Sequence, residues 1–200
     1  MKKAFTLVEV VIAIIIFGIG LLAILLVVNK NIVLSKKVLL KTKATFLAKE
    51  SLENIYNIRD TNFIKYLPWN YITWTIDEIK NNTYTRFKIW EKYITWLDLT
   101  WTKINLQKIN NLKKARLYKK NISVLNSAWE EIFSWLIYNY FTWEKTPYYR
   151  YVFFTGVYLQ PEDRIADENQ LLKVVSKVNY QYWYLTWKVE LESFIWNWKK

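Results

Sequence analysis

The residues best placed to take part in chemistry lie at the N-terminus, where Lys2 and Lys3 precede a long apolar run that contains Glu9. The run extends to Val28, and Thr6 and Glu9 are its only polar residues. As a helix it is roughly 36 Å long, enough to cross a hydrocarbon core of about 30 Å. A carboxylate inside such a span costs on the order of 2.5–3.5 kcal/mol. A plain anchor does not explain that cost, so Glu9 predicts a partner charge.

Several classes of chemistry are excluded by composition. The 200 residues contain no Cys and no His, which removes thiol nucleophiles, disulfides, the usual zinc ligands and histidine acid–base catalysis. We find no glycine-rich phosphate loop, no serine nucleophile motif and no paired carboxylates with a base. The chain is therefore expected to be an interaction protein and not an enzyme, with no cofactor and no metal.

The net charge of the chain is weaker evidence about its function. The formal net charge is +12, a balance that attracts nucleic acid or anionic lipid. The lysines are scattered along the chain, which favours a general surface bias. An acidic group follows Pro161, namely Glu162, Asp163, Asp167 and Glu168, but it lacks the ligand spacing and turn glycine of a calcium loop. We expect it to be a solvated turn.

The string K-K-A-F-T-L-V-E, followed by the apolar run, resembles the cleavage and methylation signal of type IV prepilins and pseudopilins. The resemblance implies that a prepilin peptidase cuts between Ala4 and Phe5 and methylates the new Phe5 amine, with Lys2 and Lys3 in the discarded leader. It also implies that Glu9 meets the Phe amine of a neighbouring subunit during assembly. Two features depart from the family: Ala4 replaces the usual glycine, and the apolar helix has no proline.

The same resemblance implies a location and a set of partners. The expected protein is a single-pass inner-membrane protein with a cytoplasmic N-terminus and a C-terminal domain outside the cytoplasm, later associated with a filament. Its implied partners are the prepilin peptidase, other pilin or pseudopilin subunits and the lipid bilayer. The lysines on either side of the span do not fix this orientation by themselves.

Beyond the span, apolar residues recur at helical spacing with no proline or glycine across 21–67. This predicts one continuous helix from Phe5 to about Ile58, roughly 80 Å long. The expected segments are a leader (1–4), a membrane-spanning or filament-core helix (5–28), its amphipathic continuation (29–60) and a β-rich globular domain (61–200).

Alternation of apolar and polar residues dominates the C-terminal part. Residues 172–182 and 185–195 predict two strands of an antiparallel hairpin with one solvated face, in which Lys173 and Lys177 lie opposite Glu190 and Glu192. Residues 83–90 and 148–157 are further predicted strands, whereas 130–141 fit either a helix or a strand. The fold class is therefore α+β, with a long N-terminal helix packed on an antiparallel sheet, as in pilins.

Tryptophan and glycine usage is inverted: the chain has 12 Trp and 3 Gly, whereas average usage gives roughly 14 Gly in this length. Many Trp lie where a turn favours glycine, as in P-W-N (68–70) and T-W-T (73–75). One hypothesis is that some of these codons are translated as glycine in the source organism. The alternatives are ordinary core aromatics and a surface that stacks on sugars or nucleobases.

Together these features predict a structural subunit, a minor pilin or pseudopilin, of a type IV pilus or of a type II secretion or competence-like filament. A DNA- or glycan-binding adhesive minor pilin is one alternative. An unprocessed, single-pass anchored domain is the other.

Overall fold

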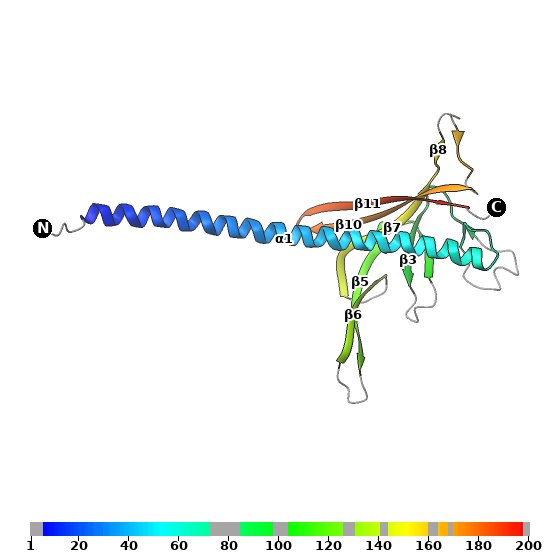
Figure 1. Cartoon of the computed structure of the whole chain (residues 1–200), viewed down its shortest axis with the longest axis horizontal. Coiled ribbons are helices and arrows are strands. Elements are labelled where there is room, and N and C mark those ends of the chain that lie inside the picture. The colour runs from blue at the N-terminus through cyan, green and yellow to red at the C-terminus, as the bar shows by residue number, and fades with distance from the viewer. Residues whose placement is uncertain are drawn as a thin grey trace. The chain divides into compact units, whose positions relative to one another are not determined.

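The computed structural model describes residues 6–72, 85–97, 104–125, 131–140, 144–159, 164–167 and 170–197. The chain forms two compact units, Met1–Thr42 and Lys43–Lys200. One helix, α1 (Leu7–Ile64), contributes to both units (Figure 1). The continuous helix expected from the sequence is therefore confirmed, and it ends a few residues later than predicted.

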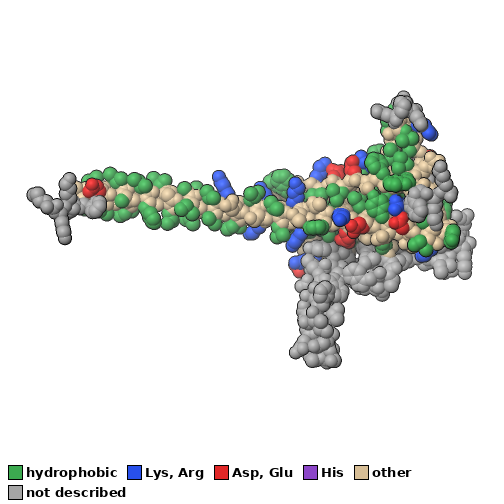
Figure 2. All heavy atoms as spheres, in the orientation of Figure 1, with side chains coloured by type: hydrophobic (Ala, Val, Ile, Leu, Met, Phe, Trp, Pro, Cys, Tyr) green, Lys and Arg blue, Asp and Glu red, His purple; other side chains and the backbone are tan. Residues whose placement is uncertain are grey.

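From Leu7 to Val28, α1 is apolar on all sides apart from Glu9. The apolar side chains from Leu7 to Val28 are exposed around the whole circumference, including Ile14 at 65% and Phe17 at 72%. Figure 2 shows hydrophobic side chains along the near face of this part of the helix. Among the described residues α1 is the one helix long and apolar enough to cross a membrane. A helix that is hydrophobic all round is stable only in lipid or among other helices.

The second unit contains an antiparallel sheet of seven strands in the order β11-β10-β7-β3-β4, with β5 pairing to β7 and to β6. Figure 1 shows the β5–β6 hairpin extending away from the other strands. The strands are β3 (Lys92–Leu97), β4 (Ile104–Ile109), β5 (Arg116–Leu125), β6 (Glu131–Asn139), β7 (Glu144–Thr155), β10 (Leu171–Tyr182) and β11 (Leu185–Trp196). Two short pairs, β1 (Tyr71–Ile72) with β2 (Thr85–Arg86) and β8 (Tyr158–Leu159) with β9 (Arg164–Ile165), and a 3₁₀ turn, η1 (Leu112–Ala115), complete the unit.

The predicted C-terminal hairpin is confirmed, and each strand is one residue longer than predicted. Cα pairing runs from Leu171 opposite Trp196 to Tyr182 opposite Leu185. The Lys177 Nζ atom lies 3.1 Å from Glu190 Oε1, and Lys173 Nζ lies 2.6 Å from Glu192 Oε2. These ion pairs lie on the solvated face that the alternation predicted.

The other strand predictions are confirmed only in part. Residues 148–157 fall largely within β7, and the ambiguous stretch 130–141 contains strand β6. Of 83–90 only Thr85–Arg86 is a strand among the described residues. Phe87 instead turns into the core, where its ring stacks on that of Phe154 at a centroid distance of 4.5 Å. Burial of this aromatic side chain outweighs local strand propensity.

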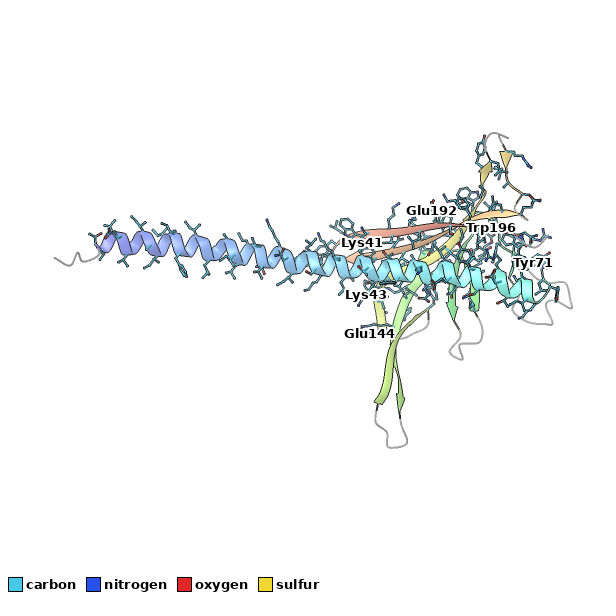
Figure 3. All side chains as sticks on the ribbon, viewed as in Figure 1. Lys41, Lys43, Tyr71, Glu144, Glu192 and Trp196 are labelled. Atoms are coloured by element: carbon cyan, nitrogen blue, oxygen red, sulfur yellow. The ribbon has the colours of Figure 1, made fainter. Side chains whose placement is uncertain are left out.

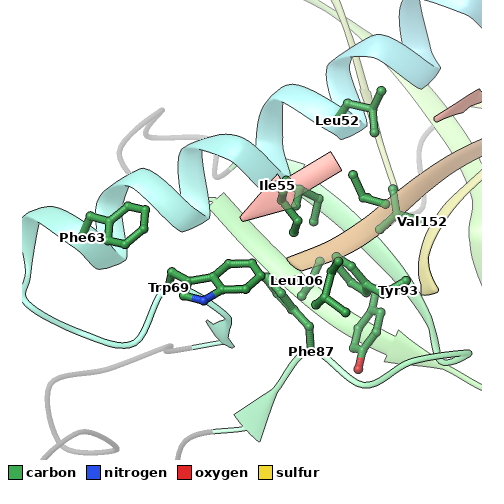
Figure 4. Close-up of a cluster of buried hydrophobic side chains, with 12 residues drawn as sticks. Leu52, Ile55, Phe63, Trp69, Phe87, Tyr93, Leu106 and Val152 are labelled. Atoms are coloured by element: carbon green, nitrogen blue, oxygen red, sulfur yellow. The ribbon is translucent and has the colours of Figure 1, made fainter. Parts of the chain in front are cut away.

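The core lies between the C-terminal part of α1 and one face of the sheet (Figure 4). Leu52, Ile55 and Phe63 of α1 pack with sheet residues such as Leu172 and Val174, and all five are at most 9% exposed. This arrangement confirms the α+β fold class, in which one helix covers a sheet and both bury their apolar faces.

A fully buried arginine also joins α1 to the sheet. The Arg150 Nη1 atom on β7 lies 2.7 Å from Glu50 Oε2 and donates to the Leu47 carbonyl at 3.4 Å. Arg150 Nη2 donates to the Thr95 carbonyl at 2.9 Å, and Nε donates to the Tyr140 hydroxyl at 3.0 Å. Burial alone lowers the pKa of Arg150, but the Glu50 charge and Tyr140 outweigh it, so the net pKa is raised and the guanidinium stays charged.

In the described part of the chain, three residues other than glycine have a left-handed backbone: Tyr66 (φ 58°), Trp90 (φ 65°) and Trp183 (φ 57°). Side chains with a Cβ atom rarely adopt this conformation, and glycine is its usual occupant. Two of the three are tryptophans, which supports the hypothesis that some Trp codons specify glycine. Trp69 behaves differently, because its side chain is 3% exposed and packs in the core beside Phe63 (Figure 4). At that position the expectation of glycine is not supported.

Candidate processing and assembly site

Helix α1 begins with a reciprocal cap formed by Thr6 and Glu9. The Thr6 backbone N–H donates to Glu9 Oε2 at 2.9 Å, and the Thr6 hydroxyl donates to the same oxygen at 3.1 Å. In return the Glu9 backbone N–H donates to Thr6 Oγ1 at 3.3 Å. This is a capping box, in which a Thr N-cap and a Glu three residues later satisfy two N–H groups at the helix start.

The cap offsets part of the free-energy cost of placing the Glu9 carboxylate in an apolar span. Because α1 starts at Leu7, Glu9 lies in the first turn of the helix. A negative charge there interacts favourably with the positive end of the helix dipole. Its carboxylate therefore has favourable contacts within its own chain, in addition to any partner charge. Both Thr6 bonds reach Oε2, so the cap does not use Oε1.

Sequence reasoning missed this cap, although the signal was available. The letters T-L-V-E fit the pattern of Ser or Thr followed three residues later by Glu or Gln, directly before an apolar run. In the sequence analysis above, these four residues are interpreted only as part of the processing signal.

A shallow apolar groove adjoins Glu9 on the surface of the helix. It is lined by Glu9, Val10, Ala13, Ile14 and Phe17 and has a volume of about 440 Å³. The small Ala13 side chain lies among larger ones and so leaves room at the helix surface. The groove thus places one carboxylate at the edge of an apolar notch.

Two glycines follow on the same helix. A Cβ atom added at Gly18 or Gly20 would meet no atom within 4 Å. Packing within the chain therefore does not require glycine at either position, although each glycine lowers helix stability by about 1 kcal/mol. Small residues on an apolar helix let a neighbouring helix approach closely.

Of the site residues predicted from the sequence, Glu9 lies in the described part of the chain. Lys2, Lys3, Ala4 and Phe5 lie outside the described residues, so cleavage before Phe5 remains a prediction. The acidic group after Pro161 also lies mostly outside it, with only Asp167 described. The described residues contain no cluster of three or more possible metal ligands.

Comparison with known proteins gives one result. Residues 1–25 match the family model of the prokaryotic N-terminal methylation motif, which is the type IV pilin-like signal. No curated protein and no solved structure matches the chain. The motif supports a type IV pilin-like or pseudopilin family, and the apolar start of α1 fits a transmembrane anchor. It points to a structural protein and not to an enzyme.

Proposed function

We propose that this protein is a subunit, a minor pilin or a pseudopilin, of a type IV pilus or of a related secretion or uptake filament. In this proposal a prepilin peptidase removes residues 1–4 and methylates Phe5. The observation that carries the proposal is the methylation motif joined directly to a helix that is apolar on every side. The β-rich unit is then presented outside the cytoplasm.

The exposed half of α1 needs an apolar environment at every stage. From Leu7 to Val28 it is about 33 Å long, which matches a bilayer core before assembly. Helices of neighbouring subunits replace lipid after assembly, and Gly18 and Gly20 allow close approach between them. One surface thus serves first as an anchor and then as an interface.

Glu9 has a separate role in this proposal. A new amino terminus on a neighbouring subunit brings a positive charge to the groove beside the Glu9 carboxylate, where Oε1 accepts from it. Pairing two charges in a medium of low polarity relieves the desolvation cost of each. The interaction is thus between a charge on one copy and a charge created by cleavage on another.

Three variants separate this assembly role from the helix cap. Glu9→Gln keeps the capping box, because Gln also functions at that position, but it removes the charge. Thr6→Ala removes the cap and keeps the charge, and Glu9→Ala removes both. The measurement is the fraction of each variant recovered in sheared filaments, relative to the membrane fraction, in cells that make the filament.

We expect Glu9→Gln and Glu9→Ala to reduce recovery in filaments at least tenfold, and Thr6→Ala to reduce it much less. If Glu9→Gln assembles like the wild type, the carboxylate acts only as a cap. If the wild type itself is absent from the sheared filaments and stays in the membrane fraction, the chain is a membrane-anchored domain and the proposal is wrong.

A further inference from the structure

A cavity at the C-terminal end of α1 is separate from the assembly surface. It has a volume of about 350 Å³ and is lined by Phe63, Tyr66, Leu67, Pro68, Trp69, Asn70, Tyr71, Arg86 and Asn197. All of these residues belong to the second unit, and Figure 3 shows Tyr71 close to the C-terminal end of α1. Its size falls within the range of small-ligand sites.

Tyr66, which lines this cavity, has a left-handed backbone conformation that is uncommon for tyrosine. Helix α1 ends in a Schellman motif, in which the Leu67 N–H donates to the Asn62 carbonyl at 2.9 Å and the Tyr66 N–H donates to the Phe63 carbonyl at 3.2 Å. The left-handed position of this motif normally belongs to glycine, yet it is occupied by Tyr66 with φ 58°. The side chain is 92% exposed, so burial does not offset the strain.

Translation of Trp codons as glycine would account for the left-handed backbone at Trp90 and Trp183. It cannot account for the left-handed backbone at Tyr66, because that residue is a tyrosine. Strained backbone positions are concentrated at functional sites. An exposed aromatic residue that lines a cavity can stack its ring on a ligand.

Hydrogen bonds hold part of the cavity wall, which also carries polar groups. The buried Asn62 amide donates to the Trp69 carbonyl at 3.2 Å and to the Tyr71 carbonyl at 2.8 Å, which fixes the loop 69–71. The Arg86 guanidinium lies over the Tyr71 ring, 5.3 Å from its centroid, and donates to the Tyr71 hydroxyl from Nη2 at 3.1 Å. Asn70 is 4% exposed and adds an amide with both donors and an acceptor.

These lining residues indicate the chemistry of the ligand. Phe63, Leu67 and Trp69 provide an apolar surface, while Asn70, Asn197 and Arg86 supply hydrogen-bonding groups. Of the lining residues that the structure describes, none is a carboxylate and Arg86 alone is a cation, which fits a phosphate backbone poorly, because such a backbone needs several basic contacts. A sugar has both an apolar face that stacks on aromatic rings and hydroxyls that bond to amides and guanidinium groups.

We propose that this cavity binds a neutral carbohydrate, with the Tyr66 ring stacked on a sugar and Asn70 and Arg86 bonded to its hydroxyls. The binding does not depend on cleavage or on assembly into a filament, so it can be tested independently of the proposed function.

The test uses the full chain in detergent and an array of neutral oligosaccharides built from glucose, galactose and N-acetylglucosamine, with single-stranded DNA as a second probe. The key variant is Tyr66→Gly, which relieves the left-handed strain and is expected to raise the denaturation midpoint. The control is Tyr184→Ala, because Tyr184 is 94% exposed in the β10–β11 turn and does not line the cavity.

We expect the wild type and Tyr184→Ala to bind at least one oligosaccharide, and Tyr66→Gly to bind it at least tenfold more weakly while remaining folded. Three results would overturn the proposal: the wild type binds none of these sugars, Tyr66→Gly binds as tightly as the wild type, or only the DNA probe shows binding that depends on Tyr66.

Discussion

Trp183 has a backbone conformation that fits glycine better than tryptophan. It is the first of the two residues between Tyr182 and Leu185, which pair across the β10–β11 hairpin, and its side chain is 73% exposed. Two-residue hairpin turns need positive φ and therefore favour glycine. The exposed indole gains little burial in return for the strain.

Trp183→Gly is therefore expected to stabilise the second unit. Relief of left-handed strain contributes roughly 1–2 kcal/mol, and the added chain entropy costs about 0.5–1 kcal/mol, so the net gain is about 0.5–1 kcal/mol. Urea unfolding of the detergent-solubilised chain measures this change.

Trp69→Gly is the matched control, because Trp69 is 3% exposed in the core and its loss should cost at least about 3–5 kcal/mol. A destabilising effect of Trp183→Gly would contradict the assignment. Peptide mass spectrometry of the protein from its source organism then shows directly whether residue 183 is glycine.

At the scale of elements, the contact between α1 and the sheet combines an apolar core with one buried charge. Arg150 is 0% exposed, whereas the Glu50 side chain paired with it is 43% exposed. A buried pair contributes little net stability, but removing one partner leaves an uncompensated charge. Arg150 thus fixes the position of α1 along β7, because its other donors are bonded to sheet and loop groups.

Glu50→Gln should lower the free energy of unfolding by about 2 kcal/mol. This is below the roughly 3–5 kcal/mol for fully buried pairs, because water reaches the Glu50 carboxylate. Glu53→Gln is the matched control, since Glu53 lies one turn further on and its pair with Lys49 is exposed at 3.7 Å. That variant should change stability by less than about 0.5 kcal/mol. Equal effects of the two substitutions would show that the buried pair does not hold the helix.

How much could be predicted from the sequence differs between elements. The strands of the β10–β11 hairpin were predictable, because alternation along much of both strands separates an apolar face from a polar one, and the length of the turn between them sets the register. The helix was predictable because no proline or glycine interrupts 21–67. Short strands such as Thr85–Arg86 were not, since their limits depend on distant contacts such as Phe87 with Phe154.

The candidate site was only partly predictable for the same reason. Glu9 was found because a carboxylate is out of place in an apolar run, and its partner Thr6 was missed although the spacing showed it. The ion pair of Arg150 with Glu50 joins residues a hundred positions apart, so no local sequence pattern predicts it. The cavity beside Tyr66 likewise depends on the meeting of the α1 terminus, Arg86 and Asn197.

At the scale of the whole molecule, the two units differ in where their apolar side chains lie. The first exposes apolar side chains throughout Leu7–Val28, while the second buries its apolar side chains between helix and sheet. This division fits a chain that is anchored by one part and presents the other. The methylation motif supports our proposal that a leader is removed in front of the anchor, which then packs against copies of itself.

The central claim is that a new amino terminus is created at Phe5. N-terminal mass spectrometry of the protein from membranes and filaments of its source organism tests it most directly. The account predicts that the mature chain begins with N-methylated Phe5 and lacks Lys2 and Lys3. A chain that still begins at Met1 or Lys2 in both fractions would contradict it, because Glu9 would then have no incoming amine to pair with.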